Sequence, residues 1–177
     1  MRLYVPVTLD ELDAVSSTPD AARWDLAPRA AHAVTGPLAQ SYPDEDDEGL
    51  EFLAALEAAD DSLALVAGRV DAPRQRAVVT VEVPDSAVEV VGAVLPPEDA
   101  DLGDDPAPSA VAVVASVPQV AIVCVHVDET TAADDVAAVL AAADAGDDPA
   151  LDAALDRVTE RNLLWYDWSE IAEIPRA

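Results

Sequence analysis

The period at which apolar residues recur changes along this chain, and this change constrains the fold more than any other feature. Apolar and polar residues alternate over short stretches such as 77–83, which is the period of a β-strand. Apolar residues recur every three or four positions over 46–67, which is the period of an amphipathic α-helix. Both periods occur within one chain, so the sequence predicts an α+β protein.

The order of these segments predicts one sheet with helices packed on one of its faces. The expected strands cover residues 2–7, 30–35, 77–83, 87–91, 111–117, 121–127 and 163–166. The expected helices cover 9–15, 46–67 and 132–145, with another from 149 and a short terminal one from 169. Residues 16–28 are expected to form a loop, and the strand at 77–83 is expected to be half exposed. A mixed β-sheet accommodates this order, and without the 30–35 strand the order approaches the ferredoxin-like βαββαβ arrangement, with insertions.

Chain length predicts that residues 1–177 form a single domain. A domain of this size can bury roughly 70% of the surface of its unfolded chain, so it needs no disulfide or metal to hold it together. Only the segment 96–108 departs from the pattern of core segments, because it is rich in proline and acidic residues. We expect this segment to be a flexible acidic loop inside the domain.

The charge of the chain is strongly one-sided. Aspartate and glutamate total 36 against nine arginines and no lysine, which gives a formal net charge of −27. Such a surface repels phosphate backbones and anionic lipids, so we expect neither direct nucleic-acid binding nor membrane association. Three explanations of the acidity remain open: codon bias of a GC-rich genome, adaptation to high salt, and mimicry of a nucleic acid. The acids fall mainly in loops and helix starts, which favours the first two.

The single cysteine and the absence of long apolar runs indicate the cellular compartment of the protein. One cysteine cannot form an internal disulfide, which fits a reducing compartment. The first residues lack the apolar stretch of a signal peptide, and no window approaches the roughly 18 apolar residues of a spanning helix. We therefore expect a cytoplasmic protein.

The strand that ends at Asp128 carries the most reactive side chains. Alternate residues of a strand share a face, so Cys124, His126 and Asp128 are expected to face one side. Ile122 is expected on the same face. These three polar residues are candidate catalytic residues, because a thiol and an imidazole on one face could form a nucleophilic pair or part of a metal site. Residues two apart on a strand are about 6.6 Å apart at Cα, however, so their side chains lie side by side. We expect instead a buried Cys124 and a hydrogen-bonded His126.

Motifs that bind phosphate groups or activate a serine are absent from the sequence. There is no Gly-x-Gly-x-x-Gly run and no Gly-x-Ser-x-Gly elbow, and a chain without lysine cannot form a Walker loop. The acids at 44, 46 and 48 with Gly49 match the start of a calcium-binding loop, but the twelfth position, which needs glutamate, is Ala55. These acids suit the N-terminus of a helix. The sequence therefore predicts no cofactor and no metal, and it inclines against an enzyme.

Aromatic residues are scarce in this chain and gather near its end. Trp165, Tyr166 and Trp168 are expected on the last strand and just after it, where Trp165 and Tyr166 would face opposite sides. One face is expected to pack in the core, and the other to leave an aromatic ring at the surface as an interaction patch. The alternative is that all of them close the core.

Three short segments together resemble a known family. They are MRLYVPVT at 1–8, VHVD at 125–128 and LLWY at 163–166. The chain resembles an uncharacterised family of small acidic actinobacterial proteins. The resemblance implies a GC-rich actinobacterial source, which supports codon bias as the origin of the charge, and it implies no activity. Relative to that family, the segment 96–108 looks like an acidic insertion.

Three functions remain as hypotheses. The first is a non-catalytic cytoplasmic protein that acts through a protein partner. The second is a small-molecule-binding protein or enzyme with its site near the end of the 122–128 strand, which a concave pocket beside His126 and Asp128 would favour. The third is an acidic mimic of a nucleic acid, which requires carboxylates aligned at the spacing of phosphates.

Overall fold

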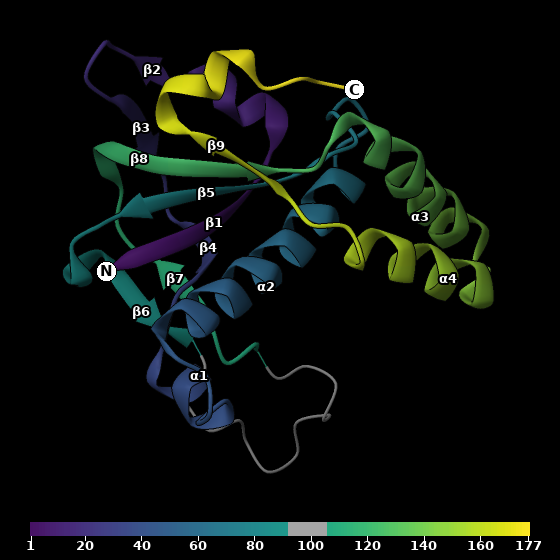
Figure 1. Cartoon of the computed structure of the whole chain (residues 1–177), viewed down its shortest axis with the longest axis horizontal. Coiled ribbons are helices and arrows are strands. Elements are labelled where there is room, and N and C mark those ends of the chain that lie inside the picture. Colours follow the sequence, from purple (N-terminus) through teal and green to yellow (C-terminus); the bar gives the residue numbers. More distant parts are fainter. Residues whose placement is uncertain (92–105) are drawn as a thin grey trace.

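The computed structural model describes residues 1–91 and 106–177, and their strands form one nine-stranded sheet (Figure 1). The strands are β1 (Arg2–Thr8), β2 (Ser16–Ser17), β3 (Ala22–Leu26), β4 (Arg29–His32), β5 (Arg76–Glu82), β6 (Val88–Val90), β7 (Ala110–Val113), β8 (Val117–Val127) and β9 (Leu164–Asp167). They are ordered β2-β3-β8-β5-β1-β4-β7-β6, and β9 pairs with β8. All pairings among these strands are antiparallel.

The helices of the described residues are of two kinds. The α-helices are α1 (Gly36–Ser41), α2 (Asp47–Ala67), α3 (Ala133–Ala145) and α4 (Asp148–Thr159). The short 3₁₀ helices are η1 (Leu9–Ala14), η2 (Asp85–Ala87), η4 (Thr130–Ala132) and η5 (Trp168–Glu173). Asp46 caps α2 by accepting the Gly49 amide at its Oδ1, 2.9 Å away, so this acid lies at a helix N-terminus, as expected, and serves there as the cap. Gly146 ends α3 with φ of 64°, a left-handed conformation that glycine adopts without strain.

The α+β class is confirmed, and the finer topology differs from the expected one. The sheet is antiparallel throughout instead of mixed, because each strand pairs with neighbours that run in the opposite direction. The ferredoxin-like order is not formed. It depended on omitting the 30–35 strand, but this segment forms β4 and pairs with both β1 and β7. As a result β1 lies between β4 and β5.

The segment 16–28 was expected to be a loop, and this prediction is wrong. It contains β2 and β3, and β3 pairs with β8. Ala22, Trp24 and Leu26 alternate as buried residues with exposed ones, which is a strand pattern. Pro19 and Pro28 flank this short pattern, and prolines are typical of loops, so the strand was not predicted. Of the expected acidic loop at 96–108, residues 96–105 lie outside the described residues.

Both faces of the sheet are covered. One face of β1 places Leu3 and Val5 in the main core, where Leu9 of η1 and Ile171 of η5 also pack. The opposite face places Tyr4 beneath α2. The α-helix α2 thus lies on one face, and the 3₁₀ helices η1 and η5 lie on the other, so the helices are not confined to one face as expected (Figure 1). Strand β5 lies between β1 and β8, so it is buried on both faces except at its last residue and is not half exposed.

Helices α3 and α4 form a hairpin that packs against the C-terminal half of α2 (Figure 1). Leu63 and Val66 of α2 share a buried cluster with Val136, Val139 and Val158 of the hairpin. The hairpin leaves the N-terminal half of α2 free of this contact. That uncovered half of α2 forms one wall of the candidate site.

Candidate functional site

A bulge in β8 changes which of its side chains share a face. Thr80 pairs with Cys124, but the next residue of β5, Val81, pairs with Ile122, so Val123 is an extra residue on β8. Because of this extra residue, Ile122 turns into the main core together with Val125. The prediction that Ile122 shares a face with Cys124 and His126 is therefore wrong, since a regular alternation cannot anticipate a bulge.

Asp128 belongs to a buried ion pair. Its carboxylate accepts hydrogen bonds from the backbone N–H, Nε and Nη2 of Arg76, each at 2.9 Å. The Arg76 side chain is 3% exposed and the Asp128 side chain is fully buried. The neighbouring Gln75 donates to the Asp128 carbonyl at 2.8 Å and accepts the amide of Ala177 at 2.7 Å. Asp128 thus ties the end of β8 to β5 and the C-terminus, and its carboxylate is engaged by Arg76.

Cys124 is a free thiol and is only 7% exposed. In the sheet it lies between Thr80 of β5 and Asp167 of β9. Burial of this kind is usual for a structural cysteine.

His126 lies on the α2 side of the sheet, where it pairs with Trp165 of β9. Its Nδ1 is buried and has no hydrogen-bond partner among the described residues. The expectation of a hydrogen-bonded His126 is therefore wrong for this atom, because β9 and α2 bring apolar groups to the ring. Burial lowers the pKa of His126 below its ordinary value of 6.5, which favours the neutral imidazole at neutral pH.

A groove opens where β8, β9 and α2 meet, and His126 is part of its wall. The groove has a volume of about 290 Å³. Its lining is mostly apolar and consists of Phe52, Ala55, Leu56, His126, Asn162, Leu163 and Trp165. Three large side chains stand exposed in this lining: Phe52 at 56%, Leu56 at 39% and Trp165 at 58%. We call this feature the α2–β9 groove.

The groove exists because α2 turns a face of small residues toward the sheet. Ala54 and Ala58 are fully buried there, and their size lets the helix lie close to the strands. Ser62 fixes this orientation, because its Oγ donates to the Val7 carbonyl at 2.7 Å and accepts the Ala77 amide at 2.8 Å. Leu50 also packs against the sheet, beside Tyr4 and Val78, whereas Phe52 and Leu56 lie on a side of the helix that stays exposed.

The three aromatic residues of the expected patch do not lie together. Trp165 lines the α2–β9 groove, whereas Tyr166 and Trp168 are partly buried against the main core on the other face of the sheet. The alternation of a strand separates Trp165 from Tyr166. Only Trp165 of the three contributes to the groove.

Sequence reasoning did not anticipate a chain of hydrogen bonds through His32. His32 Nδ1 lies 2.7 Å from Ser109 Oγ, and its Nε2 lies 3.0 Å from Asp61 Oδ2. The residue types are those of a serine nucleophile with its base, but Ser109 is fully buried, so no substrate can reach its hydroxyl. The chain of hydrogen bonds joins β4 to α2 and to the segment before β7. The three residues are far apart in the sequence, and no local motif indicates them.

Within the described parts of the chain, no group of three or more histidine, cysteine or acidic side chains is arranged to hold a metal ion. Across residues 1–91 and 106–177, no helix combines the length and apolar character needed to cross a bilayer.

Comparison with known proteins places the chain in a family. The model of a Family of unknown function (DUF6912) matches residues 1–174. The chain belongs to this family. The expected membership of an uncharacterised family is thereby confirmed. No curated protein and no solved structure was found to match the chain.

Proposed function

We propose that this protein is a non-catalytic, cytoplasmic binding protein of one domain, and that a protein partner docks in the α2–β9 groove. The observation that carries the proposal is the exposure of Phe52, Leu56 and Trp165 around one concave apolar site. Tryptophan is enriched among the residues that dominate binding energies at interfaces. Fully burying a large apolar side chain contributes roughly 1.5–3 kcal/mol, so three such residues at one site suit an interface.

The state of the candidate catalytic residues supports a non-catalytic role. Asp128 is engaged by Arg76, and Cys124 is buried within the sheet. His126 alone of the three lines the groove. A base needs a nucleophile or a proton to act on within hydrogen-bond reach. Neither Cys124 nor Asp128 is in a hydrogen bond with His126.

Leucine-to-alanine substitutions on two sides of α2 test this proposal. Leu56 lines the groove and is 39% exposed, and Leu65 is 36% exposed and lies outside the groove. Tagged wild type, Leu56→Ala and Leu65→Ala would each be used for affinity capture from cells of the source organism, at low and at high salt. We expect one partner near equal stoichiometry, retained by Leu65→Ala and reduced about fivefold or more by Leu56→Ala. Equal capture by both variants would contradict docking in the groove.

A small apolar ligand in the same groove is the second candidate function. It is favoured by the buried, unpartnered Nδ1 of His126 beside Asn162, because a few polar groups in an apolar site can orient a ligand. The volume of about 290 Å³ lies just below the range of roughly 300–1,000 Å³ for ligand pockets, so the ligand would be small. Native mass spectrometry of the purified protein would detect such a ligand as added mass, and its loss in Trp165→Ala would assign it to the groove.

Two expectations about origin accompany the proposal. We expect an actinobacterial source, and we attribute the acidic composition chiefly to codon bias. The acids then serve solubility and exclude anionic partners, and direct binding of nucleic acid is not expected.

A further inference from the structure

We infer that the occupant of the α2–β9 groove is an amphipathic α-helix of another protein, with basic residues bordering its apolar face. This inference rests on the proposed function and specifies the chemistry of the partner. Two observations carry it: the continuity of the groove with a helix-packing surface inside this protein, and the uncompensated negative charge at the start of α2.

The first observation concerns the apolar stripe of α2. Phe52, Leu56, Leu63 and Val66 follow one another at spacings of four, seven and three residues, which places them along one side of a helix. The C-terminal part of this stripe is covered by α3 and α4, which are themselves amphipathic helices. The N-terminal part is the wall of the groove. The protein thus already packs helices on this stripe, and the groove is the portion that its own helices leave uncovered.

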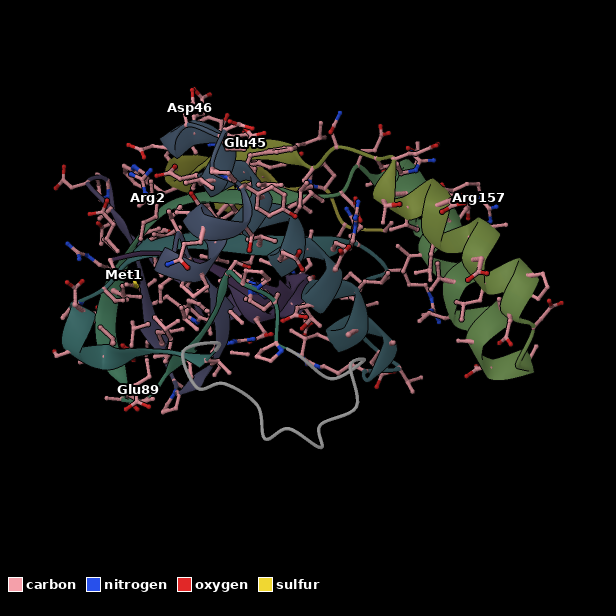
Figure 2. All side chains as sticks on the ribbon, turned by 90° about the horizontal axis from the view of Figure 1, so that it is seen from below. Met1, Arg2, Glu45, Asp46, Glu89 and Arg157 are labelled. Atoms are coloured by element: carbon pink, nitrogen blue, oxygen red, sulfur yellow. The ribbon has the colours of Figure 1, made fainter. Side chains whose placement is uncertain are left out.

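The second observation concerns charge. The five consecutive acids at 44–48 are all exposed, and none of them is in an ion pair with the described residues. Figure 2 shows Glu45 and Asp46 at the start of α2, at the opposite end of the molecule from Arg157. Glu48 precedes Phe52 by four residues, so its carboxylate lies on the same side of the helix as this groove residue.

Two arginines that lie beside groove residues are already paired with carboxylates of this chain. Arg161 precedes the groove residue Asn162, and it is paired with Glu129 at 3.0 Å and with Asp135 at 2.6 Å. Arg2 is paired with Glu51 at 3.0 Å. Among the described residues, no ion pair engages the carboxylates at 44–48, and a basic partner complements them.

The same charge argues against other occupants. A second copy of this chain carries the same net charge of −27, and docking in the groove would bring like charges together. An anionic lipid surface is repelled for the same reason. A heterologous basic helix buries the exposed Phe52 and Trp165 without that repulsion.

Two synthetic peptides test the inference directly. Both form one amphipathic helix with the same leucine face, and they differ only in the flanking positions, which are arginine in one peptide and glutamine in the other. Binding to wild type, Leu56→Ala and Leu65→Ala would be measured by titration calorimetry at low salt. We expect the arginine peptide to bind about tenfold more tightly than the glutamine peptide. We expect Leu56→Ala to weaken both peptides about fivefold or more, and Leu65→Ala to leave both nearly unchanged.

The alternative outcomes separate the inference from the proposed function. Equal binding of both peptides, weakened by Leu56→Ala, would overturn the basic partner and leave the groove as a binding site. Binding of the arginine peptide that Leu56→Ala does not change would overturn the helix-in-groove geometry and indicate charge attraction alone. Binding of neither peptide would overturn the helical occupant, and the capture comparison of the two leucine variants would still decide whether a partner uses the groove. Sedimentation of the protein alone could also show a dimer that Leu56→Ala dissociates. The occupant of the groove would then be a second copy of this chain, and the inference of a different protein would be overturned.

Discussion

Replacing Asp128 with alanine would leave the guanidinium of Arg76 buried without its counter-charge. The Arg76 side chain is 3% exposed, and it loses two charge-assisted hydrogen bonds of 2.9 Å in this variant, together with a third from its backbone amide. Removal of one partner from a buried pair costs about 3–5 kcal/mol. A domain is stable by only about 5–15 kcal/mol, so the loss is a large fraction of the total.

Urea denaturation followed by circular dichroism would measure this loss as a drop in the free energy of unfolding. The matched control is Asp13→Ala, because Asp13 is 66% exposed and pairs with Arg176 at the surface. We expect little change in the free energy of unfolding for that control, because solvent screens an exposed pair. Equal effects of the two substitutions would refute the reasoning that burial makes the Arg76–Asp128 pair important. Replacing both members of the buried pair with apolar residues should restore much of the lost stability.

Three further predictions concern buried groups and backbone geometry. Cys124 is 7% exposed, so its thiol should react with a labelling reagent only as fast as the protein opens, and rapid labelling of the folded protein would contradict its burial. Burial lowers the pKa of His126 below 6.5, so its contribution to stability should be complete above pH 6.5 and decline as the pH falls toward the lowered value. Denaturation at several pH values should show less of this decline in His126→Gln. Gly146→Ala should cost about 1–2 kcal/mol of stability because φ is 64°. Gly68→Ala, at φ of −76°, should stabilise by about 0.4–1 kcal/mol. The midpoint of thermal unfolding should therefore fall in the first variant and rise in the second.

The elements with strong and long periodicity were predicted well. The helix expected at 46–67 is α2, and the expected stop at Gly146 ends α3. Short segments were harder to predict. β3 has only five residues, and the prolines on either side of it suggested a loop.

The site was harder to predict than the fold because it depends on contacts between distant segments. The apolar stripe of α2 was visible in the sequence, but the sequence does not say which helix face meets the sheet. Ala54 and Ala58 lie on the helix face that packs on the sheet, and Phe52 is exposed. The pairing of Asp128 with Arg76 joins residues 52 positions apart, and no local pattern indicates it. The register of β8 changes at Val123, which the alternation of its residues does not reveal.

Photo-crosslinking in living cells tests the central claim most directly. A photo-reactive phenylalanine analogue would be placed at position 52, inside the α2–β9 groove, and in a second protein at position 65, outside it. Docking in the groove predicts a crosslinked partner from position 52 that is absent from position 65, and that disappears when Trp165→Ala is added. A partner crosslinked equally from both positions, or one from position 52 that persists with Trp165→Ala, would contradict the claim that the groove is the binding site.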